Sequence, residues 1–355
     1  MPYFTPLRYP GGKRRLAAFV ERLLEQNELH DVQYAEPYAG SAAIGLALLF
    51  GELASTIHIN DLSRPIYAFW HTVLNDNANL CRRIERVPLT MREWRRQRHV
   101  YENQASACLE DLGFSTLFLN RTNRSGIVGG GVIGGKEQTG KWRLDARFTK
   151  PELIQRIRRI GRYASRIKIY QMDALEFTRS VVAGLGKKAF AFYDPPYIEN
   201  GKDLYLNNYT IEGHREICRA VTGLKVPWVV TYDYSAVRHH LYLGRRRIAY
   251  GLSYAANGRH EGKEVMFLAD TISFPSQWTA DAPILISDDR SEATPVYGII
   301  ESMKPHLEMI EGPQAGERFV GALKTILKVP KSAVPTPFSK AAAKKKPKRP
   351  TKPRG

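Results

Sequence analysis

The chain has 355 residues, 43% of them hydrophobic and 25% charged, which allows one large core with a smaller inserted or appended unit. Its formal net charge of +18 favours a polyanionic partner, because binding to phosphates releases counterions. No long apolar run indicates a signal peptide or membrane helix, so a cytoplasmic location is expected, and three scattered cysteines without CxxC spacing argue against disulfides and a zinc site.

The first part of the chain predicts alternating helices and strands. Apolar residues recur at helical spacing or in short runs, separated by turn residues. The expected elements are a helix over 15–29, a strand over 34–36, a helix over 42–50, a strand over 57–60 and a helix over 64–74. This order predicts an α/β fold with a parallel, doubly wound, Rossmann-like sheet.

The strand pattern stops over residues 76–164. This segment contains Arg-rich helical stretches at 91–103 and 107–119, followed by a glycine-rich loop at 127–140. It holds 18 Lys or Arg residues against nine Asp or Glu residues. We therefore expect a basic helical insert within the α/β domain, although a solvated charged surface would also explain the charge.

The α/β pattern resumes after the insert. The expected elements are a helix over 151–164, a helix after Asp173, and strands over 167–171, 189–193, 228–232, 247–252 and 264–270. Residues 1–75 and 165–270 are thus expected to form one domain. An extension over 271–339 has weak candidate elements at 283–286, 296–300 and 319–329 and no assigned role. The tail over 340–355 holds eight basic residues and no acids, and is expected to be disordered.

Candidate ligand-binding residues follow three of the expected strands. In open α/β sheets ligands bind beyond the carboxyl ends of the strands. The first strand is followed by a turn rich in small residues, the second by Asp61 and the third by Asp173. The turn contributes Glu36, Pro37, Tyr38 and Gly40. Backbone at such a turn can approach a ligand, and the two aspartates can accept hydrogen bonds from a ribose and an adenine, so a nucleoside cofactor is predicted.

The composition of the turn distinguishes between two such cofactors. A dinucleotide would require glycine where Tyr38 stands, and its pyrophosphate would be repelled by Glu36. S-adenosylmethionine has no phosphates and carries a cationic sulfonium and an amino group, which carboxylates favour. The sequence therefore predicts S-adenosylmethionine as the cofactor.

The sequence Asp194-Pro195-Pro196-Tyr197 follows the apolar strand over 189–193. Two prolines force the chain out of the sheet and expose carbonyl groups. The Asp194 carboxylate and the Pro195 carbonyl could accept the two N–H groups of an aromatic amine and free its lone pair for methyl transfer. Tyr197 could stack on the base of a nucleotide flipped out of a duplex. These four residues are the predicted catalytic residues.

In these features the chain resembles the Dam-like DNA adenine-N6 methyltransferases with the alpha order of motifs, over about its first 270 residues. The matching segments are 9–13, 36–40, 60–61, Asp173, 194–197 and 264–268. The resemblance implies a site-specific, adenine-specific DNA methyltransferase that uses S-adenosylmethionine and a target-recognition insert. It also implies that Tyr9 and Lys13 contact the methionine end of the cofactor, and that Asp194 lies in the same site.

The insert matches the family only in outline. Arg121, Asn123 and Arg124 are candidates for contacts to DNA bases or phosphates, since Arg suits guanine and Asn suits adenine. Helix capping by the same residues is an equal alternative. The glycine runs at 129–131 and 134–135 are not expected in the corresponding segment of an enzyme that recognises GATC. The DNA sequence that this chain recognises therefore stays open. The polar segment 199–209 is expected to be a loop over the target base.

Double-stranded DNA is the partner expected from these features. RNA adenine or protein amide methylation is the nearest alternative, because the same pair of acceptors can hold other planar amines and amides. A DNA-binding protein with a vestigial methyltransferase fold is a second alternative. A companion restriction endonuclease is a further possible partner that the sequence leaves open.

Overall fold

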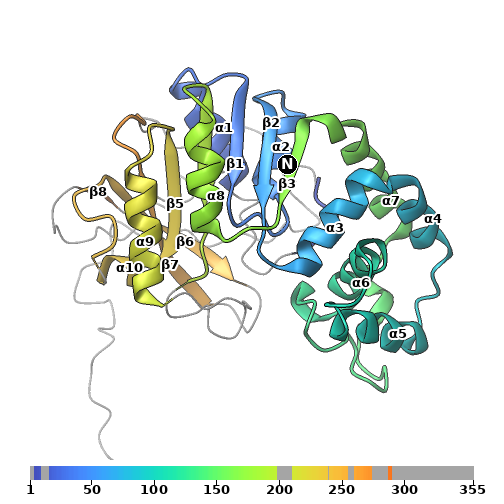
Figure 1. Cartoon of the computed structure of the whole chain (residues 1–355). Coiled ribbons are helices and arrows are strands. Elements are labelled where there is room, and N and C mark those ends of the chain that lie inside the picture. Colours follow the sequence, from blue (N-terminus) through green and yellow to red (C-terminus); the bar gives the residue numbers. More distant parts are fainter. Residues whose placement is uncertain are drawn as a thin grey trace, which may run out of the picture. The chain divides into compact units, whose positions relative to one another are not determined.

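A computed structural model describes residues 4–8, 16–197, 210–238, 240–254, 260–273 and 287–289. The chain divides into two compact units, Met1–Ile300 and Glu301–Gly355, and all the described elements lie in the first (Figure 1). The segment 199–209, the candidate elements at 283–286, 296–300 and 319–329, and the tail over 340–355 lie outside the described residues.

One mixed sheet of eight strands organises the first unit, in the order β3-β2-β1-β4-β5-β7-β6-β8. The strands are β1 (Val32–Glu36), β2 (Ala54–Asn60), β3 (Ile167–Tyr170), β4 (Ala189–Tyr193), β5 (Trp228–Asp233), β6 (Arg247–Tyr254), β7 (His260–Leu268) and β8 (Ser287–Asp289). The first five are parallel, whereas β7, β6 and β8 pair antiparallel. The doubly wound α/β fold expected from the sequence is therefore confirmed, and β8 is a strand that the sequence did not predict.

The strand order reverses at β1, which pairs with β2 on one side and with β4 on the other. Crossovers to opposite sides leave a crevice beyond the carboxyl ends of such a strand pair. Glu36 ends β1, and Asp194 directly follows β4. The sheet therefore brings the predicted cofactor turn and the predicted catalytic residues to the carboxyl ends of two adjacent strands, where a ligand crevice is expected.

The helices around the sheet are α1 (Ala17–Gln26), α2 (Ala43–Phe50), α3 (Arg64–Asn75), α8 (Ala174–Ser180), α9 (Ile211–Thr222) and α10 (Ser235–Arg238). The pair α8 and α9 lies in front of the strands in the view of Figure 1. Both begin at a capping side chain, because Asp173 accepts from the amide of Leu175 and Thr210 accepts from the amide of Gly213.

The chain between β2 and β3 is helical. Beyond α3 it forms α4 (Asn77–Arg86), α5 (Met91–Glu102), α6 (Leu109–Thr122) and α7 (Lys150–Arg162), and this fully described stretch adds no strand to the sheet. The helix α6 packs closely on α3, since a Cβ on Gly113 would lie 2.2 Å from Thr72 Oγ1 and 2.5 Å from the Ala68 carbonyl oxygen. The helix α4 was not expected from the sequence. The boundaries of the recognition insert at 76 and 164 stay a prediction.

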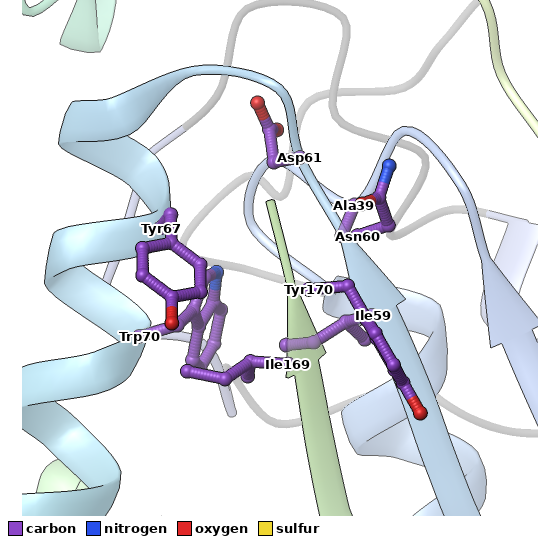
Figure 2. Close-up of a pocket in the computed structure, with 8 residues that line it drawn as sticks. All are labelled: Ala39, Ile59, Asn60, Asp61, Tyr67, Trp70, Ile169 and Tyr170. Carbon is purple, nitrogen blue, oxygen red and sulfur yellow. The ribbon is translucent and has the colours of Figure 1, made fainter. Parts of the chain in front are cut away.

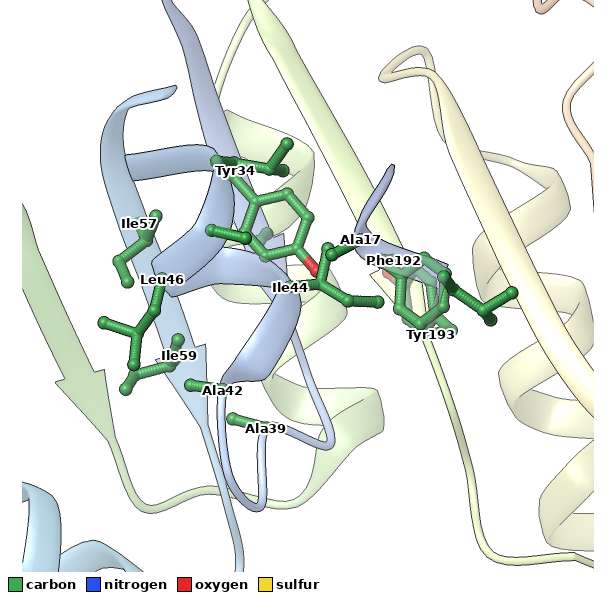
Figure 3. Packing of buried hydrophobic residues seen from close by; sticks show 14 of the residues in the cluster. Ala17, Tyr34, Ala39, Ala42, Ile44, Leu46, Ile57, Ile59, Phe192 and Tyr193 are labelled. Atoms are coloured by element: carbon green, nitrogen blue, oxygen red, sulfur yellow. The ribbon is translucent and has the colours of Figure 1, made fainter. Parts of the chain in front are cut away.

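The core that fixes the strand ends is built from apolar strands and α2. Every residue of β4 and β5 is buried. Figure 3 shows Ile44 and Leu46 of α2 beside Tyr34, Ile57 and Ile59 of β1 and β2. Each fully buried side chain of this size contributes about 1.5–3 kcal/mol. The carboxyl ends of these strands therefore project from a well-packed layer.

Within the described ranges, no helix is long and apolar enough to cross a membrane. The same residues contain no group of three His, Cys, Asp or Glu side chains arranged to hold a metal ion. Cys81 is buried, Cys108 is exposed and Cys218 is intermediate, and all three are free thiols.

Candidate active site

The turn after β1 is tied to the end of β2. The amide of Gly40 donates to Oδ2 of Asp61 at 3.0 Å, and the amide of Ala39 donates to the Asn60 carbonyl at 2.9 Å. From α3, the indole N–H of Trp70 donates to the Gly40 carbonyl at 3.0 Å. Gly40 has a φ of +47°, a backbone conformation that favours glycine. The turn and Asp61 thus form one rigid unit at the beginning of α2.

Asn60 connects the ends of three strands. Its side chain is 1% exposed and donates to the carbonyls of Pro37 at 3.0 Å and Met172 at 3.1 Å. Its Oδ1 accepts from the amide of Met172 at 2.9 Å. Asn60 therefore braces the backbone beyond β1 and β3 from its position at the end of β2. The sequence placed Asn60 only within a family motif and did not identify this structural role.

A hollow lies beside Asp61, between β2, β3 and α3, as Figure 2 shows. It is a shallow depression too narrow to hold a water molecule. It is lined by Ala39, Ile59, Asn60, Asp61, Tyr67, Trp70, Ile169 and Tyr170. The neighbouring Leu62 is 40% exposed. The rings on α3 and β3 were missed in the sequence, since only the fold brings them beside Asp61.

Glu36 is a buried carboxylate beside the crevice. Its side chain is 5% exposed, and no described residue forms a hydrogen bond with its Oε2. A Cβ on Gly45 would lie 3.4 Å from that oxygen and 3.1 Å from the Tyr34 ring, so glycine leaves room here. Burial, followed by the charge of Asp194 and with a smaller effect of Asp61, raises the pKa of Glu36 well above its usual value and outweighs the lowering effect of the nearby Gly45 amide and Tyr34 hydroxyl. A bound cation would relieve this unfavourable charge.

Asp61 is also perturbed, although it has hydrogen-bond donors. Its Oδ1 accepts from the amide of Ser63 at 2.9 Å, and Oδ2 accepts from Gly40. Burial raises the pKa of Asp61 to about 6 and outweighs the lowering effect of these two donors. Glu36, Asp61 and Asp194 are thus close enough for their charges to interact. Strongly perturbed carboxylates at a crevice are typical of ligand sites.

Asp173 has a local role at the beginning of α8. Its Oδ1 accepts from the amide of Leu175 at 2.8 Å, so it caps the helix, and its side chain is partly exposed. The cap fixes the carboxylate at the end of the loop after β3. Tyr38 is partly buried against the core and Pro37 is buried in the same turn. Tyr9 and Lys13 lie outside the described residues.

The predicted catalytic residues are held by β5 and β7. Thr231 on β5 donates to Oδ1 of Asp194 at 2.7 Å. Pro195 and Pro196 are buried, and the partly exposed Tyr197 donates its hydroxyl to Oε1 of Glu264 on β7 at 2.6 Å. Sequence patterns did not indicate that Thr231 and Glu264 contact these residues, because they lie 37 and 67 positions further along the chain.

Arg121 lies at the end of α6 and is 8% exposed. Burial, with repulsion from Arg156, Arg8 and Arg147, lowers its pKa to about 10, and Glu152 opposes that effect. No described residue forms a hydrogen bond with its Nε. An arginine in this setting favours an anionic partner. Arg124, in contrast, is exposed.

Asn123 supports the loop that follows α6. It is fully buried, and its Oδ1 accepts from the indole N–H of Trp94 at 2.7 Å. Its Nδ2 donates to the carbonyls of Ile127 at 3.1 Å and Val128 at 2.8 Å. This placement argues against the contact between Asn123 and DNA expected from the sequence, and favours the alternative of a structural role.

Asn120 joins α6 to the N-terminal segment. Its Oδ1 accepts from the Arg8 amide at 2.8 Å, and its Nδ2 donates to the carbonyls of Arg8 at 2.6 Å and Gly126 at 2.7 Å. Gly126, at a φ of +79°, packs so closely that a Cβ there would lie 2.6 Å from the Arg8 carbonyl oxygen. The helical segment is thus attached to the backbone at Arg8, which precedes the predicted cofactor segment 9–13 in the sequence.

The glycine-rich loop is braced rather than open. Arg98 donates to the carbonyls of Gly129 at 2.8 Å and Gly130 at 3.1 Å. Gln138 donates to the Ile133 and Gly135 carbonyls and accepts from the Leu144 amide. This loop presents Trp142, which is 65% exposed, with the Lys141 ammonium 5.9 Å from its ring centroid. An exposed aromatic ring among basic residues is suited to a nucleic acid.

Comparison with known protein families identifies one matching family. A family model described as D12 class N6 adenine-specific DNA methyltransferase matches residues 9–253. No curated protein matches the chain significantly.

Two solved structures show distant similarity. One is a putative RNA methyltransferase from Pyrococcus horikoshii, with 9% identity and a TM-score of 0.35 over 74% of this chain and 85% of that chain. The other is TrmN from Thermus thermophilus, with 10% identity and a TM-score of 0.32 over 71% and 48%. These TM-scores are too low for the two structures to indicate the function of this chain.

Proposed function

This chain belongs to the D12 class N6 adenine-specific DNA methyltransferase family, and on that basis we propose that it methylates the exocyclic N6 of adenine in duplex DNA at a specific site. Membership of a methyltransferase family implies S-adenosylmethionine as the methyl donor. When bound, the donor supplies an electrophilic methyl group on a cationic sulfonium. The residues at the carboxyl ends of β1 to β4 are chemically suited to hold it.

The carboxylates carry the cofactor assignment. The buried Oε2 of Glu36 has no hydrogen-bond partner among the described residues and lies near the charges of Asp194 and Asp61, a setting that suits a cationic ligand. Asp61 is assigned to the ribose hydroxyls and Asp173 to the adenine of the cofactor. The backbone at Pro37, Tyr38 and Gly40 forms the floor of the proposed cofactor site. Tyr9 and Lys13 are proposed contacts to the methionine end.

Asp194 is the central catalytic residue of the proposal. Thr231 holds one carboxylate oxygen, and an ionised carboxylate has further acceptor sites for an adenine N–H. The Pro195 carbonyl accepts the second N–H, so the nitrogen lone pair is no longer delocalised into the ring. Tyr197 stacks on the face of the flipped base, and Pro196 fixes the turn between them. The proton on N6 leaves after transfer, so no base is required beforehand.

DNA as substrate is supported by the helical segment between β2 and β3. Residues 76–164 carry +9 of the net charge of +10 that lies outside the C-terminal tail. Arg121 and Arg124 are proposed to contact DNA, with Arg121 directed to a phosphate because of the positive charges of its neighbours Arg8, Arg147 and Arg156. Trp142 is proposed to stack on a base. Asn123 is retained only as support for this loop.

The single observation that carries the proposal is the placement of Asp194 beside the perturbed carboxylates Glu36 and Asp61. A cofactor site and an acceptor for a planar amine therefore share one crevice. RNA methylation uses the same arrangement and is the second candidate, favoured by no specific observation on this chain. A protein without catalytic activity would leave this group of carboxylates unexplained.

The proposal is tested by supplying labelled S-adenosylmethionine with duplex DNA, structured RNA and a protein mixture in parallel. The label is expected in DNA alone, with N6-methyladenine as the only methylated nucleoside. Label in RNA but not in DNA would show that RNA is the substrate. Cofactor binding without transfer to any of the three would indicate a non-catalytic DNA-binding protein. Sequencing of methylated adenines from an expressing host would give the site and show whether a companion restriction endonuclease needs to be sought.

A further inference from the structure

Glu264 is a carboxylate buried in the middle of the antiparallel part of the sheet. It lies on β7 opposite Tyr250 of β6 and Asp233 of β5, and its side chain is 1% exposed. Oε1 accepts from the Tyr197 hydroxyl and Oε2 accepts from the Tyr250 hydroxyl, each at 2.6 Å. The carboxylate therefore links two strands to the last predicted catalytic residue.

A carboxylate at this depth is unfavourable for folding unless its oxygens are hydrogen-bonded. O–H···O⁻ bonds of 2.5–2.7 Å are charge-assisted and stronger than neutral ones, and both bonds at Glu264 have this length. An apolar residue of similar size would pack between the strands without this cost. The Glu264 carboxylate is therefore explained by the two tyrosine hydroxyls that it holds rather than by a contribution to the free energy of unfolding.

The Tyr197 and Tyr250 hydroxyls stay protonated throughout the neutral range. Burial, then the charges of Asp194 and Glu264, raises the pKa of Tyr197 well above its usual value. Burial and Glu264 do the same for the pKa of Tyr250. Both hydroxyls consequently keep their protons and donate to the carboxylate.

We propose that Glu264 is a positioning residue that fixes the direction in which the Tyr197 side chain points by holding its hydroxyl. The backbone fixes one end of the side chain and Glu264 fixes the other, so the ring cannot swing about the Cα–Cβ bond. Tyr250, which is fully buried, holds the second oxygen and keeps the carboxylate oriented. The target base then stacks on a ring that is already oriented, which is how positioning lowers the barrier to transfer. This inference rests on the proposed function of Tyr197.

The test combines Glu264→Gln, Tyr197→Phe and the double variant. Duplex DNA with 2-aminopurine in place of the target adenine reports stacking of the flipped base. Each single variant is expected to lower kcat by about 10-fold, with brighter 2-aminopurine emission and an unchanged Kd for S-adenosylmethionine. The double variant should be no slower than either single variant, because both act on the same hydrogen bond: Glu264→Gln replaces the charged acceptor by a neutral one, and Tyr197→Phe removes the donor. Multiplicative losses in the double variant would overturn the proposal.

Glu93→Gln is the matched control. Glu93 is 8% exposed in α5, and its Oε1 accepts from Gln97 at 2.6 Å, so the control removes the charge of another buried carboxylate away from the crevice. It should leave kcat and emission unchanged. If Glu264→Gln only lowers the Tm, with wild-type kcat and emission, Glu264 is structural and the proposal is wrong. If Glu264→Gln does not fold, Tyr197→Phe alone must still show the kcat loss and the brighter emission.

A substrate-free measurement separates this inference from the proposed function. In enzyme with ring-labelled tyrosine, Glu264→Gln should shift and broaden the NMR signals of Tyr197 without DNA or cofactor. Unchanged signals would refute the positioning role even if the wild-type enzyme methylates DNA. Changed signals in an enzyme that methylates no nucleic acid would support the positioning contact while the proposed function fails.

Discussion

The Thr231 hydroxyl donates to Oδ1 of Asp194 at 2.7 Å, across the pairing of β5 with β4. The same hydroxyl lies 3.3 Å from the Tyr193 carbonyl. The carboxylate that would receive the target amine is therefore oriented by the neighbouring strand and not by its own loop.

Removal of this hydroxyl should slow methyl transfer. Thr231→Val preserves the shape of the side chain but leaves one oxygen of Asp194 without its donor. A hydrogen bond to a charged group contributes about 1.5–3 kcal/mol, so kcat is expected to fall about 10- to 100-fold. Single-turnover kinetics with duplex DNA measure this loss. Thr231→Ser keeps the hydroxyl and should stay within about 3-fold of wild type by the same argument; equal losses in both variants would contradict the role.

The raised pKa of Asp61 predicts that its ionised carboxylate lowers the free energy of unfolding of the free enzyme, although the same carboxylate is proposed to bind the cofactor. A carboxyl whose pKa rises from 3.8 to about 6 on folding binds protons more tightly in the folded state. Its ionisation therefore destabilises the folded protein, fully above pH 6 and less as the pH falls toward 4. Asp61→Asn removes the charge but sets its NH2 group against the amide of Gly40 or Ser63, so the expected effect lies in the pH dependence: relative to wild type, the free energy of unfolding of the cofactor-free variant should be higher at pH 7.5 than at pH 4.5 by about 1–2 kcal/mol.

Thermal unfolding at pH 7.5 and pH 4.5 checks this sign. The Tm of Asp61→Asn relative to that of wild type should be lower at pH 4.5 than at pH 7.5, while the affinity for S-adenosylmethionine falls at pH 7.5. A variant that is destabilised equally at both pH values would show that the Asp61 carboxylate is not strained in the free enzyme.

Trp142 is expected to contribute to DNA affinity without contributing to stability. Stacking of one base on an aromatic ring is worth about 1–3 kcal/mol, so Trp142→Ala should weaken DNA binding about 5- to 100-fold. Because the side chain is 65% exposed, the Tm should change little. Fluorescence anisotropy with labelled duplex measures the affinity, with Trp142→Phe as the aromatic control. Wild-type affinity in Trp142→Ala would exclude the stacking contact.

The C-terminal tail is expected to add affinity that does not depend on sequence. Deletion of residues 340–355 removes eight basic residues. The logarithm of the DNA-binding constant should then fall less steeply with the logarithm of salt, by about 0.9 for each phosphate that the tail neutralises. The methylated sequence should stay the same. A changed methylation site on sequencing would assign the tail a role in recognition instead.

The sequence predicted the sheet well because its strands are short apolar runs whose character does not depend on context. All seven expected strands are present within four residues at their ends. The helix α4 was missed, since Leu80, Cys81 and Ile84 are its only buried residues in an otherwise polar segment. The position of β7 between β5 and β6 could not be read from the sequence, because strand order depends on packing.

The candidate site was predictable only where residues follow a strand directly. Glu36, Asp61 and Asp194 stand out because a polar residue ends an apolar run. Thr231 and Glu264 escaped notice, since each looks like an ordinary strand residue until the fold brings it to the catalytic residues. Asn123 was misleading for the converse reason. Its partner Trp94 lies in another helix, and burial turns a candidate DNA contact into a brace.

The account is tested most directly by product analysis with wild-type enzyme and Asp194→Ala. Duplex DNA is incubated with labelled S-adenosylmethionine, digested to nucleosides and separated, and cofactor binding is measured calorimetrically on the same preparations. The wild-type enzyme should yield labelled N6-methyladenine, whereas Asp194→Ala should still bind the cofactor and yield at least about 100-fold less product. Undiminished N6-methyladenine from Asp194→Ala, or methylcytosine from the wild-type enzyme, would contradict the account.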